Sequence, residues 1–130
     1  MKLMVIDDEK TVCALVGDYF RHLGYEVSTV TDSLKALAQI KTERPHIILL
    51  DINMPGLRGL PLLKRIREQD KDVKVIMVTI VDDAKTREEA TAAGANAFVR
   101  KPFSTEYLEN VVLGKVRELY PLIKRSKDHE

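Results

Sequence analysis

The fold of this chain is decided near its middle by the stretch Ile47-Ile48-Leu49-Leu50, which ends on Asp51. Four aliphatic residues in a row, with no polar residue between them, are typical of a central strand that is covered on both faces. Farther out along the chain, Leu3 to Ile6 and Val73 to Thr79 have the same nearly continuous apolar character. Strands of this kind belong to parallel sheets, because crossover helices cover both faces of such a sheet. The three stretches therefore predict the centre of a parallel sheet.

Two weaker strand candidates and five helical segments complete the pattern. The strand candidates are Tyr25 to Val30, which mixes polar with apolar residues, and the very short Ala97 to Val99. A segment with helical spacing follows each strand. The bounds of these five segments are Val12 to Gly24, Asp32 (or Ser33) to Pro45, Gly59 to Gln69, Asp82 (or Asp83) to Gly94, and Ser104 to Pro121. The first helix is expected to bury a stripe of Val12, Leu15, Val16, Tyr19 and Leu23, and the fourth an almost purely alanine face. This alternation predicts an α/β fold, a five-stranded parallel sheet wrapped by helices in three layers.

Length and composition limit the class of protein. A chain of 130 residues, 45% hydrophobic and 32% charged, is typical of one folded domain and not of a disordered or membrane protein. Its formal charge of +1 does not demand nucleic acid or a membrane surface as a direct partner. The single cysteine, Cys13, excludes an intrachain disulfide and indicates a packing residue. With no signal peptide pattern, we expect a cytoplasmic domain over residues 1–121, and a polar tail or the start of a linker over residues 122–130.

Polar residues follow the predicted strands where a parallel sheet forms its sites. Asp7, Asp8 and Glu9 follow the first strand, Asp51 the third, Thr79 ends the fourth, and Arg100-Lys101 follow the fifth. Ligands of open α/β sheets bind outside the carboxyl ends of the strands, where the strand order reverses. In a sheet of order 2-1-3-4-5 the first and third strands are neighbours. Asp7, Asp8 and Asp51 would then lie together, with Thr79 and Lys101 to one side.

Three carboxylates in one crevice repel one another, so the cluster should raise at least one carboxyl pKa or recruit a cation. Hard oxygen ligands without histidine or cysteine favour Mg²⁺ or a similar divalent ion. With the hydroxyl of Thr79 and the ammonium of Lys101 opposite, the site suits a phosphoryl group, and a carboxylate can accept that group as an acyl phosphate.

These residues resemble the receiver domain of two-component response regulators over roughly residues 2 to 120. The resemblance is carried by Asp7-Asp8, the segment Asp51-Ile52-Asn53-Met54-Pro55-Gly56-Leu57-Arg58-Gly59, Thr79, and Lys101-Pro102-Phe103. It implies a flavodoxin-like (CheY-like) doubly wound fold of strand order 2-1-3-4-5. It also implies a signalling phosphoprotein of a phosphorelay rather than an enzyme, a switch that catalyses only its own phosphotransfer and autodephosphorylation.

The resemblance further implies a role for each site residue. Asp51 would accept a phosphoryl group from the phosphohistidine of a sensor histidine kinase or a phosphotransfer protein. Mg²⁺ would be held by Asp8, Asp51 and the backbone carbonyl of Asn53, with Asp7 acting mainly through water. Thr79 and Lys101 would bind the phosphoryl oxygens, and the Lys101–Pro102 peptide bond would be cis.

The switch of the family couples Thr79 to an aromatic residue three positions before Lys101, which is Phe98 in this chain. Phosphorylation is then expected to reshape the surface formed by the fourth helix, fifth strand and fifth helix. This surface would control a downstream protein or an output domain missing from this chain, or mediate dimerisation. Two residues depart from the common pattern: Ile80 is bulky where a small residue is usual, and Arg58 replaces a frequent acidic residue.

Other interpretations remain beside this one. Each residue has an ordinary structural role: Asp7-Asp8 as a helix cap, Thr79 as a strand residue, Lys101 as a solvated charge, and Phe98 as simple core. A phosphatase of the haloacid dehalogenase type also uses an aspartate nucleophile and Mg²⁺, but it needs a second aspartate where this chain has Asn53. A receiver-like domain that only mediates protein contacts would not need the intact acidic set.

Overall fold

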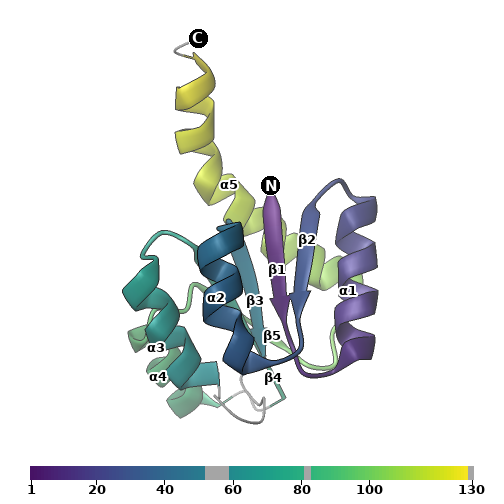
Figure 1. Cartoon of the computed structure of the whole chain (residues 1–130), viewed down its shortest axis with the longest axis vertical. Helices are drawn as coiled ribbons and strands as arrows, with labels where there is room; N and C mark the ends of the chain where they lie inside the picture. The colour runs from purple at the N-terminus through teal and green to yellow at the C-terminus, as the bar shows by residue number, and fades with distance from the viewer. Residues whose placement is uncertain (52–58, 81–82, 129–130) are drawn as a thin grey trace.

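The structure, a computed structural model, describes residues 1–51, 59–80 and 83–128, with side chains up to residue 119. Its elements are, in chain order, β1 (Lys2–Ile6), α1 (Lys10–His22), β2 (Glu26–Val30), α2 (Ser33–Glu43), β3 (Ile47–Asp51), α3 (Gly59–Gln69), β4 (Lys74–Thr79), α4 (Ala84–Ala92), β5 (Ala97–Arg100) and α5 (Thr105–Asp128). Strands and helices alternate as predicted (Figure 1).

The five strands form one parallel sheet of order β2-β1-β3-β4-β5, which confirms the predicted fold. In the pairing of β1 with β3, Ile6 lies beside Leu50. The next residue of each strand is an aspartate, so the register brings Asp7 and Asp51 level at the carboxyl edge of the sheet.

Two hydrophobic cores cover the two faces of the sheet. One face packs against α2, α3 and α4, and its buried helix residues are Ala36, Ile40, Leu62, Leu63, Ile66 and Ala90. The other face packs against α1 and α5 through Cys13, Val16, Phe20, Leu108 and Val112. Figure 1 shows α2, α3 and α4 on one side of the strands and α1 on the other. The central strand β3 is buried along its whole length, as its apolar run predicts.

The predicted stripe of α1 is wrong in part. Leu15 is 62% exposed and Leu23 is 45% exposed, while the buried positions include Cys13, Val16 and Phe20. The helix instead turns the stripe of Cys13, Val16 and Phe20 toward the sheet, and the ring of Phe20 packs edge-on against Tyr25. Leu15 is left on the outer surface next to the carboxyl edge of the sheet.

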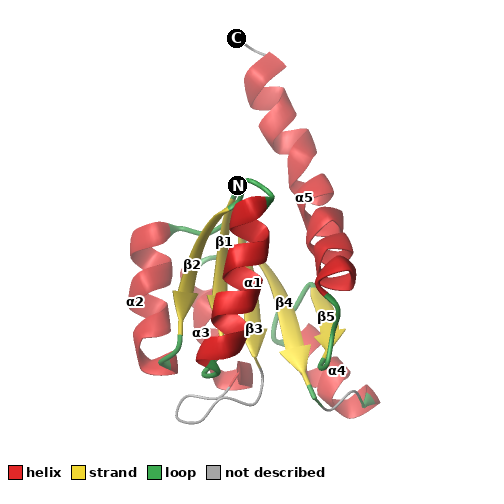
Figure 2. Ribbon diagram, turned by 90° about the vertical axis from the view of Figure 1, so that its right-hand side faces the viewer, coloured by secondary structure: helices red, strands yellow, loops and turns green. Residues whose placement is uncertain are grey.

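Helix α5 does not end at Pro121, as the sequence suggested, but continues to Asp128. Proline lacks an N–H and disfavours a helix interior, but the leucine, isoleucine, lysine and arginine residues around it tolerate or favour a helix. Figure 2 shows the C-terminal part of α5 extending beyond the sheet, away from the edge where the strands end. Before this point, Glu118 pairs with Lys74 at 3.3 Å and ties α5 to the start of β4. The domain boundary at residue 121 stays a prediction.

His46 supplies a pH-dependent contact at the opposite edge of the sheet. Its Nδ1 accepts a hydrogen bond from the backbone N–H of Lys2 at 3.0 Å. Burial, together with the charges of the amino terminus and Lys2, lowers the pKa of His46 below its ordinary value of 6.5, against the opposing charge of Glu26. The folded protein therefore binds fewer protons here than the unfolded chain. The stabilisation is complete above pH 6.5 and is lost as the pH falls through the lower folded pKa.

We expect the free energy of unfolding to fall by less than about 1 kcal/mol from this group as the pH drops below 6.5, because His46 is exposed and solvent screens its ring. Urea unfolding at neutral and mildly acidic pH measures the loss. His46→Asn keeps an acceptor near the Nδ1 position but does not titrate, so part of the pH dependence should disappear. An unchanged pH dependence in that variant would contradict the assignment.

Candidate functional site

Three carboxylates meet at the carboxyl edge of β1 and β3. Asp7 and Asp51 are buried, with 3% and 4% of their surfaces exposed, whereas Asp8 is exposed. One carboxylate oxygen from each of the three residues lies within 4.8 Å of the other two. The structure thus brings together the three acids that the strand ends and register were expected to bring together.

Lys101 reaches into this acidic cluster from the loop after β5. Its Nζ lies 2.8 Å from Oδ2 of Asp7, 3.3 Å from Oε1 of Glu9 and 3.6 Å from Oδ2 of Asp51. Burial alone lowers the pKa of Lys101, but the hydrogen bond to Asp7 and the charges of Asp51 and Asp7 outweigh it and raise the pKa above its usual value. The ammonium is therefore charged and compensates part of the negative charge.

The backbone fixes the position of Lys101. The Lys101–Pro102 peptide bond is cis, and the N–H of Lys101 donates to the carbonyl oxygen of Thr79 at 2.8 Å. This hydrogen bond continues the pairing of β4 with β5 by one residue, so the lysine leaves the sheet directly beside Thr79. Thr79 itself is 2% exposed at the end of β4.

Asp7 is held in place by contacts on each side of its peptide unit. Its N–H donates to the carbonyl oxygen of Val30 at 3.0 Å, and its Oδ1 accepts from the N–H of Glu9 at 2.9 Å. Its carbonyl oxygen accepts from Sγ of Cys13 at 3.3 Å. Burial, and secondarily the charge of Asp7, raise the pKa of the Cys13 thiol to about 11, so the thiol is protonated and serves packing, as predicted.

Phe98 lies half-buried on β5, on the face that packs against α4. The Cζ atom of Arg87, from α4, lies 5.1 Å from the centre of the Phe98 ring. A guanidinium over an aromatic face is attracted to it, by about 0.5–1 kcal/mol at exposed positions. The aromatic residue at the expected switch position is thus in direct contact with α4. Asn53 and Arg58, two further residues singled out in the sequence, lie outside the described residues.

An apolar groove of about 430 Å³ adjoins the acidic cluster. Lys101 and Glu9 lie at the side shared with that cluster, and the rest of the groove is lined by Val12, Leu15, Val16, Ile80, Pro102 and Phe103. Ile80 is 59% exposed. The exposed side chains of Leu15 and Ile80 therefore line the same groove as Lys101.

Two residues of this region were not predicted to take part. Glu9 pairs with Lys101. The sequence indicates only that Glu9 is one of the acidic residues that follow the first strand, two positions after Asp7. Arg87 contacts Phe98 across eleven positions of sequence, and no pattern in the sequence marks such a pair.

The cluster fits a hard divalent cation. All three candidate ligand side chains offer carboxylate oxygens, two from buried residues and one from an exposed residue open to solvent. Mg²⁺ prefers such oxygen ligands and keeps several water molecules, so an open, partly exposed carboxylate site suits it.

Comparison with known proteins gives consistent results. A family model described as "Response regulator receiver domain" matches residues 3–113. The probable transcriptional regulatory protein TcrX of Mycobacterium tuberculosis is 32% identical over 124 residues, which are 95% of this chain and 50% of TcrX. Sporulation initiation phosphotransferase F of Bacillus subtilis is 30% identical over 85% of this chain and 90% of that protein.

Solved structures agree. The chemotaxis protein CheY4 of Vibrio cholerae superposes with a TM-score of 0.83 and 31% identity, over 86% of this chain and 95% of that chain. The chain spans about half the length of several curated relatives that it matches. No helix in the described part of the chain is long and apolar enough to cross a membrane.

Proposed function

This chain belongs to the response regulator receiver domain family, and on that basis we propose that it is a phosphorylation switch in which Asp51 accepts the phosphoryl group. One observation carries the assignment to Asp51. Its carboxylate is 4% exposed at the carboxyl end of the central strand, with Oδ2 3.6 Å from Nζ of Lys101 and within reach of the other two acids.

In the proposed reaction, a carboxylate oxygen of Asp51 attacks the phosphorus atom of a phosphohistidine. The P–N bond breaks, the imidazole nitrogen keeps the bonding electron pair and takes a proton from water, and an aspartyl phosphate remains on Asp51. Lys101 balances the charge that builds up on the phosphoryl oxygens, and the hydroxyl of Thr79 donates to one of them.

Mg²⁺ would be held by the carboxylates of Asp8 and Asp51, with Asp7 acting mainly through water and with the backbone carbonyl of Asn53, outside the described residues, as a further proposed ligand. When bound, the ion supplies positive charge that stabilises the transferring phosphoryl group. Asp7 and Glu9 meanwhile keep Lys101 at the site through their ion pairs.

The output of the switch is proposed to be the surface of α4, β5 and α5. Phosphorylation would draw Thr79 toward the phosphoryl group and allow Phe98 to change its position, which α4 would sense through Arg87. This surface would then bind a downstream protein or an output domain, or pair with a second copy of the chain. This chain matches only about half the length of several transcriptional regulators, and this partial match supports control of an output domain.

The apolar groove supports docking of the phosphodonor. Lys101 lines the groove and also contacts Asp51, so a helix carrying phosphohistidine that packs on Leu15 and Ile80 would present its imidazole beside the acidic cluster. The exposed leucine and isoleucine would be buried by that contact, and apolar anchors of this kind carry much of the binding energy of an interface.

We expect the protein to gain one phosphoryl group from acetyl phosphate when Mg²⁺ is present, and none after chelation of the metal, as measured by intact mass spectrometry. Leu15→Asp should leave this uptake unchanged but slow transfer from the best donor in a panel of phosphorylated histidine phosphotransfer proteins by about tenfold or more. Leu34→Asp is the matched control, since Leu34 is 74% exposed on α2 and does not line the groove. Metal-independent uptake would count against the proposed site, and equal slowing by both variants would count against the docking surface.

A further inference from the structure

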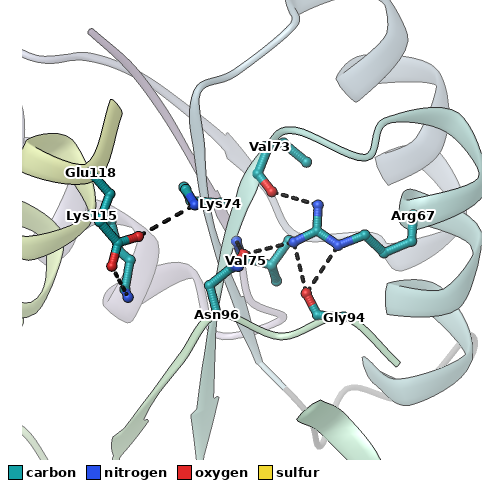
Figure 3. Close-up of polar contacts among 8 residues, drawn as sticks. All are labelled: Arg67, Val73, Lys74, Val75, Gly94, Asn96, Lys115 and Glu118. Atoms are coloured by element: carbon teal, nitrogen blue, oxygen red, sulfur yellow. Dashed lines mark hydrogen bonds and ion pairs between the residues drawn. The ribbon is translucent and has the colours of Figure 1, made fainter. Parts of the chain in front are cut away.

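Arg67, near the end of α3, binds the turn that connects α4 to β5. Its Nε and Nη2 donate to the carbonyl oxygen of Gly94 at 2.9 and 2.7 Å, and Nη2 also donates to Oδ1 of Asn96 at 2.6 Å. Its Nη1 donates to the carbonyl oxygens of Val73 and Asp70. Figure 3 shows the guanidinium of Arg67 between Gly94, Asn96 and Val73. One side chain thus joins α3, the loop between α3 and β4, and the α4–β5 turn.

A second set of hydrogen bonds ties the same turn to β4. The N–H of Asn96 donates to the carbonyl oxygen of Val75 at 2.8 Å, and the N–H of Val75 donates to Oδ1 of Asn96 at 2.8 Å. Oδ1 of Asn96 therefore accepts from both Arg67 and Val75. Hydrogen bonds from a charged group are stronger than neutral ones, and this guanidinium is partly buried. These contacts fix the turn to two different elements.

Gly94 is adapted to this contact in two ways. Its φ of +110° lies in the region that residues with a side chain avoid. A Cβ atom at this position would also lie 2.7 Å from Cγ and Nε of Arg67, closer than such atoms approach. The backbone can accept hydrogen bonds from Arg67 because the residue at the turn has no side chain.

Most of the side chains of α4 are exposed. Of the residues of α4, Ala90 is the buried one. A hollow of about 430 Å³ lies between α3 and the C-terminal half of α4, lined by Leu60, Lys64, Glu89, Ala92 and Ala93, so the hydrogen bonds of the turn, and not close packing on α3, hold this end. Toward its first turn, α4 contacts β5 through the exposed Arg87 over Phe98. The two ends of α4 therefore differ: dense hydrogen bonding holds the turn at the C-terminal end, whereas most side chains toward the N-terminal end are exposed.

We propose that the turn of residues 93–96, fixed by Arg67, is the pivot about which α4 moves. The N-terminal end of α4, which lies closer along the chain to Thr79, moves, while the C-terminal end keeps its place on α3 and β4. This inference rests on the proposed function for the signal that drives α4. The anchoring of the turn is a property of the unphosphorylated protein and is testable without that signal.

Amide hydrogen exchange of the unphosphorylated protein tests the anchor. In the wild type, the amides of Ala95 and Asn96, which donate to Ala90 and Val75, should exchange at least about tenfold more slowly than those of Thr86 and Arg87 in the first turn of α4. Arg67→Met keeps the aliphatic stem and removes the donors, so it should speed exchange at residues 95 and 96 by about tenfold or more. Arg67→Lys keeps the charge but not the planar fork, and it should speed exchange at the same two amides. This variant replaces Arg67→Met in the test if Arg67→Met does not fold.

Arg87→Met is the matched control, because it removes a guanidinium from α4 itself. It should speed exchange in the first turn of α4 and leave residues 95 and 96 protected. Equal exchange at both ends of α4 in the wild type would overturn the proposal. A uniform rise in the exchange rate of all amides in the Arg67 variants would also overturn it, because that result indicates only lower global stability.

A second experiment repeats the exchange measurement with beryllium fluoride and Mg²⁺, which together mimic the phosphoryl group on Asp51. We expect this probe to change the amide exchange rates at residues 86 and 87 but not at residues 95 and 96. Binding that changes exchange equally at both ends would overturn the pivot and leave the proposed function standing. A complete lack of response to the probe would count against the proposed function. The exchange rates of the unphosphorylated protein and its Arg67 variants would still show whether Arg67 anchors the turn.

Discussion

Replacing Asp51 by asparagine is expected to abolish phosphoryl uptake and to stabilise the metal-free protein by about 1–2 kcal/mol. The amide of asparagine is a poor nucleophile, so no acyl phosphate forms. The gain in stability arises because Asp51 is buried with a carboxylate oxygen within 4.8 Å of one from Asp7 and one from Asp8, and like charges this close together repel one another. Intact mass spectrometry with acetyl phosphate and Mg²⁺ measures the first effect, and urea unfolding without metal measures the second.

Asp32→Asn is the matched control for this prediction. Asp32 caps α2 by accepting from the N–H of Leu34 at 3.0 Å, and asparagine caps helices about equally well. This control should keep both phosphoryl uptake and stability. Undiminished phosphorylation of the Asp51→Asn protein would show that another residue is the acceptor.

Replacing Lys101 by methionine should have the opposite effect on stability. The loss of the ammonium leaves Asp7 and Asp51 buried without their cation, and breaking a buried ion pair by removing one partner costs about 3–5 kcal/mol. Phosphoryl uptake should also fall strongly, because the developing charge on the phosphoryl oxygens loses a counter-charge. Mg²⁺ should restore more stability to the Lys101→Met protein than to the wild type, since it replaces the missing positive charge.

Thermal or urea unfolding with and without Mg²⁺ measures these differences. Lys74→Met is the control, since Lys74 pairs with Glu118 at the surface and such pairs contribute less than about 1 kcal/mol. If Lys101→Met and Lys74→Met destabilise the metal-free protein equally, the acidic cluster does not depend on Lys101 in the way proposed.

Much of the fold could be predicted because the strands are short, apolar and separated by helical spacing. The run Ile47 to Leu50 predicts a strand covered on both faces, and β3 is buried along its whole length. Sequence patterns also predicted the helix ends at Gly24 and Gly94, and both residues have positive φ. Glycine is selected there because other residues avoid that conformation.

Other features depended on packing that the sequence does not encode locally. Leu15 fits an apolar stripe on α1 but is exposed, because helical spacing does not say which of two adjacent stripes faces the sheet. Pro121 suggested a helix end, yet α5 continues past it, since strong helix formers on both sides favour the helical backbone.

The candidate site was predictable to the extent that strand order determines it. Once β1 and β3 are neighbours, Asp7 and Asp51 must lie at the same edge, and Thr79 and Lys101 follow from the next two strands. The detailed pairing was not predictable. The closest carboxylate to Lys101 is Asp7, at 2.8 Å, with Asp51 at 3.6 Å, and only the cis turn and side-chain geometry decide this order.

We expect phosphorylation at Asp51 to be transmitted through Thr79 and Phe98 to α4. Titration with beryllium fluoride and Mg²⁺, followed by amide NMR shifts in the wild type and in Asp51→Asn, tests this transmission. In the wild type, saturable, Mg²⁺-dependent shifts should spread from Asp51 to Thr79, Phe98 and the first turn of α4, and these shifts should be absent in the variant. Shifts confined to the acidic cluster, or equal shifts in the Asp51→Asn protein, would contradict it.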